Sequence, residues 1–464
     1  MAEGRPGHGE AAPGDHLQTG YQLWLVGHQL EHWRAPWRDP YSFRPEVKPR
    51  WNLAGWPFGL SYWPLQRAFG TVPAWNLFVL LGFLGVGGCA ALWLRELGLR
   101  RNAAVLGGLA FALAPYLQAQ WSAGHLLAWI AMLIPLSLFA LERARRRSTW
   151  WLLLSGAALA SIPLSGQLHL ALAAIPFFGF YALLRFRPGL LLVAPALVAG
   201  LLAYVAAVRD TTGASGRSFG QVERYSADPS DLVSRHAHEL ERFVYVGWTV
   251  LGLALVGLAL LLASRRWGLA ALLGLGALVP ALLALGANLP GYETLWRHLP
   301  GLRNTRVPER LMPVACLALA ALAAIAVSRA RWPGTAALVA LLLLVDLRVG
   351  LFHATAADEH NRAYAALRAQ PQGRLLELPV YLPDRQEASV YLYYAMQAPR
   401  ERPAGYSTTA PLEADAQLRE LQKSPCRNLA ALGVRYITTH AAANPCGGRL
   451  LRRAGPVASY SVER

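Results

Sequence analysis

Short arginine-rich connectors alternate with long apolar segments, and this alternation constrains the fold more than any other feature of the chain. Five connectors together carry thirteen arginines and only two acidic residues. They are residues 95–101, 142–147, 185–187, 265–266 and 329–331. Short loops rich in arginine stay on the cytoplasmic side of a membrane because they resist translocation. The pattern therefore predicts a multi-pass membrane protein whose basic loops face the cell interior.

The apolar segments have the length that a membrane requires. A hydrocarbon core of about 30 Å is crossed by about 17–25 apolar residues that rise about 1.5 Å each along a helix. Ten segments lie near this length: 75–97, 102–118, 125–142, 149–164, 168–184, 189–208, 244–263, 267–286, 311–328 and 335–352. We therefore expect an α-helical polytopic membrane protein with about ten transmembrane helices. Its 15% of charged residues agrees with this, since soluble proteins carry about 25%.

The net charge of +17 has the same origin. In a soluble chain, such a charge would first indicate a nucleic-acid partner. Here most of the excess lies in the five connectors, so it reports membrane orientation and predicts contact with membrane lipids. No nucleic-acid partner is expected.

This orientation divides the chain into three parts. Residues 1–74 form an outer N-terminal region, residues 75–352 form the transmembrane domain with outer loops 208–244 and 287–310, and residues 353–464 form an outer C-terminal domain. In the last part, the runs 375–382, 435–439 and 457–462 read as strands and 411–423 reads as a helix. We expect a small α/β extracytoplasmic domain, with the C-terminus outside the cytoplasmic (inner) membrane.

The N-terminal region is unusual for a segment that lies outside the cell. Residues 1–13 lack the apolar core of a signal peptide. Loss of one N-terminal transmembrane helix from this sequence is the simpler explanation, and translocation of a polar tail is the alternative. Residues 17–33 show helical spacing and lie close to several tryptophans, which predicts an amphipathic helix at the membrane interface.

Two of the four cysteines fall in the predicted outer domain. Cys426 and Cys446 are twenty residues apart, whereas Cys89 and Cys316 lie in apolar segments and read as packing residues. In an oxidising compartment, the first two would form a disulfide worth about 3 kcal/mol in the loop-entropy model.

Asp15 is the first acidic candidate for chemistry. It opens the helical run, where it would either cap the helix or act as a general base at the membrane surface. His28 and His32 are one helical turn apart and would suit a shared metal, but no third ligand is positioned by the sequence. A solvated histidine pair is the alternative, so a divalent metal is possible but unsupported.

Polar residues at the outer ends of apolar segments are further candidates. Arg303 directly precedes the run NTRVPER, which contains Arg306 and Arg310. These three guanidinium groups would bind a lipid phosphate or simply anchor the helix at the interface. His125 and His169 lie at two neighbouring outer ends and would either line one cavity or cap helices. Asp346 lies deeper, where an ionisable group is a functional candidate.

Several pieces of sequence resemble one known class of enzymes. These pieces are GDHLQTGYQLWLVGHQL with DPYSF, then GWPFG, YWP, APYLQAQWSAGH, PLSLFALERAR, RVPER, LELPV, GYS and LGVRYI. Together they resemble bacterial multispanning proteins of the GT-C glycosyltransferase class, over nearly the whole chain. Members of this class typically have an acidic residue in the first outer loop and use a sugar donor carried on a polyprenyl phosphate.

The resemblance implies a function and a set of roles. It implies a membrane glycosyltransferase that moves a sugar from a polyprenyl-phosphate carrier to a glycan, lipid or protein acceptor at the outer face. Asp15 would be the catalytic base, Arg306 and Arg310 would bind the carrier phosphate, and His16, His125 and His169 would help bind the substrates. The alternatives are a non-catalytic translocator of lipid or polysaccharide, a cell-envelope assembly protein, or an inactive fragment.

Overall fold

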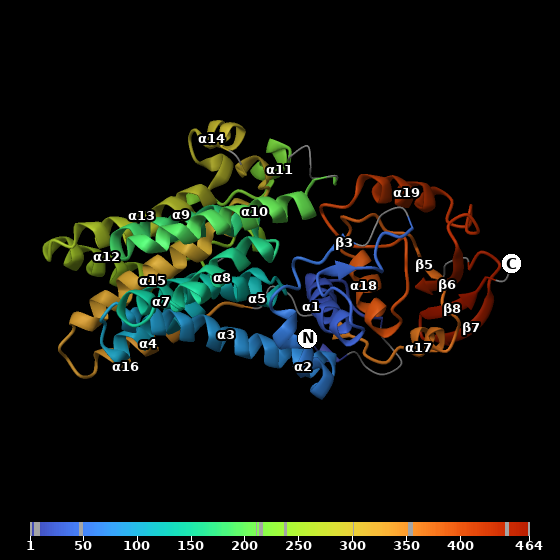
Figure 1. Ribbon diagram of the computed structural model, residues 1–464, viewed down its shortest axis with the longest axis horizontal. Helices are drawn as coiled ribbons and strands as arrows, with labels where there is room; N and C mark the ends of the chain where they lie inside the picture. The colour runs from blue at the N-terminus through green and yellow to red at the C-terminus, as the bar shows by residue number, and fades with distance from the viewer. Residues whose placement is uncertain are drawn as a thin grey trace.

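The long helices gather at one end of the molecule and the main sheet lies at the other, with helix α1 (Asp15–Glu31) between them (Figure 1). The computed structural model describes residues 2–3, 10–45, 50–209, 211–212, 217–235, 239–299, 301–350, 356–440 and 445–462. Two short strand pairs lie outside the main sheet. In the first, β1 (Ala2–Glu3) runs parallel to β4 (Ala356–Ala357); in the second, β2 (Arg38–Asp39) runs antiparallel to β3 (Arg50–Trp51).

Each predicted apolar segment coincides with a helix or a pair of helices. These are α3 (Thr71–Glu96), α4 (Arg101–Ala112) with α5 (Pro115–Ser122), α6 (Leu127–Ile130) with α7 (Leu133–Arg146), α8 (Trp151–Leu164), α9 (Leu168–Arg185), α10 (Val193–Ala207), α12 (Trp248–Ala263), α13 (Trp267–Ala284), α15 (Met312–Arg329) and α16 (Thr335–Asp346). Outside them, α2 (Gly59–Phe69) precedes α3, and α11 (Phe219–Arg224) and α14 (Tyr292–His298) lie in the two long loops.

The structure does not confirm the predicted number of membrane crossings. In the described part of the chain, six helices are long and apolar enough to cross a membrane, and the bent pair α4 and α5 would make a seventh. The pair meets at an angle of 47°. Three further apolar helices, α8, α12 and α16, have 14, 16 and 12 residues. The polytopic helical fold is therefore confirmed, whereas the count of about ten spans is not.

Helix α15 forms the centre of the bundle. It packs against α12, α13 and α4, and all of its residues from Met312 to Val327 are buried. Its sequence consists mainly of alanine and leucine, and small residues let neighbouring helices approach closely. Gly257 of α12 shows how close this approach is, because a Cβ at that position would lie 2.0 Å from the carbonyl oxygen of Leu322.

The two acidic residues of the basic connectors form ion pairs there. Glu96 lies 2.8 Å from the Nε of Arg143, and the buried Glu142 lies 2.6 Å from the Nε of Arg185. Each pair joins two different connectors. These two acids therefore tie together the arginine-rich ends of α3, α7 and α9.

The C-terminal part folds around a four-stranded sheet with the strand order β5-β6-β8-β7. Strand β5 (Arg374–Leu378) runs parallel to β6 (Val434–His440), whereas β6 with β8 (Val457–Ser461) and β8 with β7 (Arg449–Ala454) are antiparallel. The helices of this part are α17 (Arg362–Arg368), α18 (Ala388–Gln397) and α19 (Leu412–Lys423). The small sheet domain predicted from the sequence is therefore confirmed.

Helix α1 is held between the membrane helices and the C-terminal domain. It packs against α2 on one side and α18 on the other, and most of its residues are buried. The apolar cluster of Tyr21, Leu25, Tyr41, Leu392 and Ala395 joins it to α18. The predicted helix is thus present, and its placement at the membrane interface stays a prediction.

Cys426 and Cys446 form a disulfide in the C-terminal domain, with their Cα atoms 5.2 Å apart. We expect that Cys426→Ser lowers the local unfolding free energy of this domain by about 3 kcal/mol, because the open loop has more conformational freedom when unfolded. Hydrogen exchange of the sheet amides in the full chain would measure the loss. Cys89→Ser, which removes a free thiol, is the matched control. Equal protection of the sheet in the two variants would contradict this prediction.

Candidate active site

Asp15 is the first residue of α1, and its carboxylate joins three distant parts of the chain. The Nε2 of His125 lies 2.7 Å from Oδ2 of Asp15, and the hydroxyl of Tyr406 donates a hydrogen bond of 2.8 Å to Oδ1. The N-cap position belongs to Gly14, and no side chain caps the helix. The interpretation of Asp15 as an N-cap is therefore wrong.

The surroundings of Asp15 favour its charged form. Burial of the carboxyl group opposes ionisation, but the hydrogen bond and charge of His125, the hydrogen bond from Tyr406 and the charge of Arg310 act in the other direction. Together they lower the pKa of Asp15 well below its usual range. The carboxylate is therefore ionised at neutral pH, and it is a poor proton acceptor while both donors stay in place.

His125 is positioned by a tight turn between α5 and α6. Gly124 adopts a φ of +80°, and a Cβ there would lie 2.7 Å from atoms of His16. Only glycine therefore lets this turn approach the first turn of α1 so closely. The Nδ1 of His125 lies 2.7 Å from Oε1 of Gln120, so both ring nitrogens face oxygen atoms.

Gln120 links this histidine to the arginine-rich loop before α15. Its Nε2 lies 3.4 Å from Oε1 of Glu309, which is only 1% exposed. The second oxygen of Glu309 is also buried, with no hydrogen-bond partner among the described residues. Glu309 precedes Arg310 directly, so a chain of side-chain contacts runs from Asp15 through His125 and Gln120 to this loop.

His16 lies next to Asp15 but faces the protein interior. It is 5% exposed, and its ring meets the edge of Trp75 at a centroid distance of 5.8 Å. Burial lowers the pKa of His16 to about 4, so the ring is neutral at pH 7. His16 does not belong to the residues that line the groove described next.

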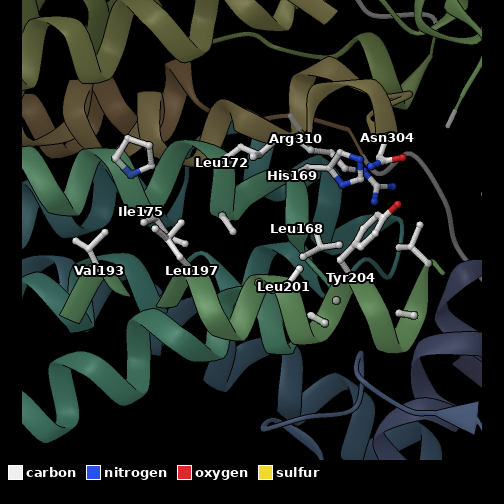
Figure 2. A pocket seen from close by; sticks show the side chains of 18 of the residues that line it. Leu168, His169, Leu172, Ile175, Val193, Leu197, Leu201, Tyr204, Asn304 and Arg310 are labelled. Carbon is white, nitrogen blue, oxygen red and sulfur yellow. The ribbon is translucent and has the colours of Figure 1, made fainter. Parts of the chain in front are cut away.

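A large groove of about 1170 Å³ opens beside this site, between α9, α10 and the loop before α15. Along the helices its wall is apolar, as Figure 2 shows for Ile175, Val193, Leu197 and Leu201. At the end nearer the C-terminal domain, the lining becomes polar. It includes His169, Tyr204, Arg217, Asn304, Arg306, Arg310, Thr408 and Thr409.

Three arginines concentrate positive charge at the polar end of the groove. Arg217, Arg306 and Arg310 all line it, and within the described residues none of them forms an ion pair with a carboxylate. Burial together with the charges of Arg306 and Arg310 lowers the pKa of Arg217. The Nε of Arg310 is buried, and no residue that the structure describes accepts a hydrogen bond from it. Such a cluster is suited to an anion that neutralises it.

The structure brings together some of the predicted site residues and separates others. Arg306, Arg310 and His169 share the groove, whereas His125 is bound to Asp15 and does not line it. Sequence reasoning gave no role to Tyr406, Glu309 or Arg217. Tyr406 lies in the GYS piece and Glu309 in RVPER, so the motifs held a signal for both. Nothing in the loop 208–244 singled out Arg217.

Other predicted candidates have structural partners. Asp346 accepts hydrogen bonds from Arg235 at 2.9 Å and from Tyr245 at 2.7 Å. These two residues are the partners that a carboxylate in an apolar helix requires. His28 lies 2.7 Å from the hydroxyl of Tyr41, and His32 contacts the carbonyl of His28. Across the residues that the structure describes, no group of three or more His, Cys, Asp or Glu side chains is placed to hold a metal ion.

Comparison with known proteins identifies the fold. No family model and no curated protein matches this sequence. The arabinofuranosyltransferase AftD from Mycobacteria matches with a TM-score of 0.53 and 15% identity, over 100% of this chain and 40% of that chain. A mutant form of AftD gives 0.53 and 13%, over 99% and 42%. The apo oligosaccharyltransferase of Archaeoglobus fulgidus gives 0.50 and 12%, over 92% and 66%.

The chain thus spans less than half of AftD and about two thirds of the oligosaccharyltransferase. Identities this low show similarity of fold alone. That fold is the one of GT-C membrane glycosyltransferases, so the resemblance stated from the sequence motifs is confirmed at this level.

Proposed function

We propose that this chain is a membrane glycosyltransferase that transfers a sugar from a polyprenyl-phosphate carrier to an acceptor hydroxyl at the outer face of the cytoplasmic membrane. The observation that carries the proposal is the groove between α9 and α10. Its apolar wall suits an isoprenoid chain, and its arginine-rich end suits a phosphate. Asp15 is connected to that end through His125, Gln120 and Glu309.

The proposed reaction is a single displacement with inversion at the sugar. The acceptor oxygen forms a bond to the anomeric carbon while the bond from that carbon to the phosphate oxygen breaks. The proton of the acceptor hydroxyl goes to Asp15, and the electron pair of the broken bond leaves with the polyprenyl phosphate. Arg306 and Arg310 stabilise the charge that develops on this leaving group.

For this role, Asp15 has to lose one of its present hydrogen-bond donors. An acceptor hydroxyl that takes the place of Tyr406 or His125 would itself donate to the carboxylate. The pKa of Asp15 would then rise toward the range in which it accepts a proton. We assign the remaining predicted residues to the same reaction: His125 orients Asp15, His169 contacts the carrier at the polar end of the groove, and His16 supports the first turn of α1.

A transfer assay with the purified chain in lipid tests this proposal. The assay supplies radiolabelled sugars on polyprenyl phosphate, together with a panel of glycan, lipid and protein acceptors. Labelled product whose anomeric configuration is inverted supports the enzyme. Tight binding of the carrier with no transfer to any acceptor would instead favour a translocator, an assembly protein or an inactive fragment.

His125→Asn is expected to move the acid limb of the pH profile of kcat/KM to higher pH. His125 makes the largest contributions that lower the pKa of Asp15, and burial raises it. Without His125 its contributions are lost while the effect of burial remains, so Asp15 is protonated at a higher pH than in the native chain and the base is lost there. In the native chain the carboxylate stays ionised even at pH values below about 3.9, which is the reference pKa of an aspartate side chain.

The profile is measured between about pH 4.5 and 8, where the native chain should show no acid limb and His125→Asn should lose activity as the pH falls. His298→Asn is the matched control, because His298 is exposed on α14, contacts the carbonyl of Thr294 and does not line the groove. A profile of His125→Asn that stays as flat as that of the native chain would show that Asp15 is not the titrating base.

A further inference from the structure

A second pocket lies where α1, α2 and the C-terminal domain meet. Its volume of about 420 Å³ falls within the range of about 300–1,000 Å³ that small-molecule sites occupy. Trp24 and His28 come from α1, Trp63 and Arg67 from α2, and Arg368 from the end of α17. Trp24 is nine residues after Asp15, which corresponds to about 13 Å along the helix. The pocket is therefore separate from the groove and the candidate active site.

The aromatic part of this pocket is held in place. A Cβ on Gly27 would lie 2.3 Å from the ring of Trp63, so the ring packs directly on the backbone of α1. Its indole N–H donates to Oε1 of Glu31 at 2.8 Å. Trp24 stacks on the ring of His28 at a centroid distance of 4.3 Å. Two indole rings are thus fixed in a pocket that already exists without a ligand.

The polar part carries an excess of positive charge. Glu31 is the one acidic residue of the lining, and its Oε1 accepts from the Nε of Arg67 at 3.0 Å. Arg368 and Arg400 instead donate to backbone carbonyls, with Gln397 as the partner of Arg368. Burial lowers the pKa of His28 to about 4, so its ring adds no charge at pH 7.

This combination selects one class of ligand. The flat faces of sugar rings pack on indoles, and their hydroxyls match the amides of Gln66 and Gln372, each of which both donates and accepts hydrogen bonds. A bare phosphate would have no use for the aromatic surface or for the acceptors. The excess positive charge in turn favours a ligand that carries a carboxylate.

We propose that this pocket binds an anionic saccharide, with a sugar ring packed against Trp24 and Trp63 and its carboxylate bound by Arg67 and Arg368. The terminal Nη atoms of both arginines are available for this, because the contacts found in the described part of the chain use only the Nε of each. The site makes no use of the groove, so the proposal stands independently of the glycosyl transfer proposed above.

Binding of a matched pair of disaccharides tests the proposal. Cellobiouronic acid and cellobiose differ only in a carboxylate that replaces a hydroxymethyl group. Saturation-transfer NMR and calorimetric titration of the full chain in nanodiscs, without any sugar donor, should show that cellobiouronic acid binds at least about tenfold more tightly, the order that one charge-assisted hydrogen bond gives.

Variants locate the binding within the molecule. Trp63→Ala should abolish binding of both disaccharides, whereas Trp33→Ala should not, because Trp33 is 98% exposed and outside the pocket. Arg67→Gln, at a side chain that is 69% exposed and tolerant of substitution, should remove most of the preference for the acid. The exposed Arg34→Gln should leave that preference unchanged.

Three results would overturn the proposal. They are equal affinity for the two disaccharides, binding that survives Trp63→Ala in a folded protein, and displacement of the acid by inorganic phosphate at equal concentration. Loss of sugar transfer in the assay for the groove would have no bearing on these measurements.

Discussion

Replacement of Asp15 by Asn is expected to reduce kcat for sugar transfer by about 10²- to 10⁴-fold, the range that general base catalysis contributes. Asparagine keeps the size of the side chain and one oxygen, but it cannot take the proton of the acceptor hydroxyl. Because the proposed phosphate site lies in the groove and Asp15 does not line that groove, KM for the polyprenyl-phosphate sugar should change little. Initial rates at saturating acceptor, measured over a series of donor concentrations, separate these two constants.

Two controls test whether a loss of activity in Asp15→Asn has a cause other than the missing base. Glu420→Gln on α19 makes the same change from carboxylate to amide at an exposed residue whose one ion pair is weak, so it should retain full activity. Thermal unfolding of Asp15→Asn should show that the protein still folds, since Tyr406 can still donate to the remaining oxygen. Native kcat in folded Asp15→Asn would eliminate Asp15 as the base.

The membrane bundle was the most predictable part of this protein. Segment length and arginine placement are local properties, and every predicted segment coincides with helix. The count of about ten spans stays unconfirmed, because α8, α12 and α16 are apolar but shorter than a full membrane crossing. Helix α16 ends at Asp346, where the carboxylate binds Arg235 and Tyr245, well before the predicted end at residue 352.

Only part of the secondary structure of the C-terminal domain was predicted, because burial decides which strands and helices leave an apolar pattern in the sequence. Strands β5, β6 and β8 are mostly buried, so each contains several apolar residues that mark it as a strand in the sequence. Strand β7, with the sequence RLLRRA, lies at the edge of the sheet and is largely exposed, so it gives no apolar signal. Helix α18 was missed because its tyrosine-rich sequence is buried on nearly all sides and lacks a helical stripe of polar residues.

The active site was predictable only in its separate pieces. The resemblance to GT-C proteins gave Asp15 a role, but the two partners of its carboxylate lie 110 and 391 residues away in the sequence. No spacing rule connects positions so far apart. The groove is likewise formed by α9, α10, a loop before α15 and the segment around Thr408. Such sites arise from tertiary packing, which a single sequence does not encode locally.

Charge balance explains why the polar end of the groove stands apart from the rest of the protein. Elsewhere, some buried charges form ion pairs, as Glu142 does with Arg185 and Glu377 does with Arg402. In the groove, Arg217, Arg306 and Arg310 line the same polar end, and no carboxylate of the described residues forms an ion pair with any of them. Repulsion among them costs stability in the empty state, which is a common property of binding sites. The ligand that restores the balance has to be anionic.

The double substitution Arg306→Gln and Arg310→Gln is therefore expected to raise KM for the polyprenyl-phosphate sugar and to lower kcat, with kcat/KM reduced by about 10²-fold or more. Each lost hydrogen bond to a charged phosphate is worth about 1.5–3 kcal/mol, and the two neighbouring losses need not add. Both constants change because the guanidinium groups bind the donor and also stabilise the departing phosphate. Rates measured over a range of donor concentrations give both effects.

The control for this variant lies in the same loop. Arg303 is exposed and does not line the groove, so Arg303→Gln removes the same charge without loss of a phosphate contact. It should retain nearly native kcat/KM. Within the described residues, neither Arg306 nor Arg310 forms an ion pair with a carboxylate, so the double substitution leaves no carboxylate without its partner. The double variant should therefore unfold at the same temperature as the native chain or above it. A double variant with native KM and kcat for the donor would show that the phosphate binds elsewhere. A lower unfolding temperature with intact kcat/KM would show that these arginines stabilise the fold and do not bind the donor.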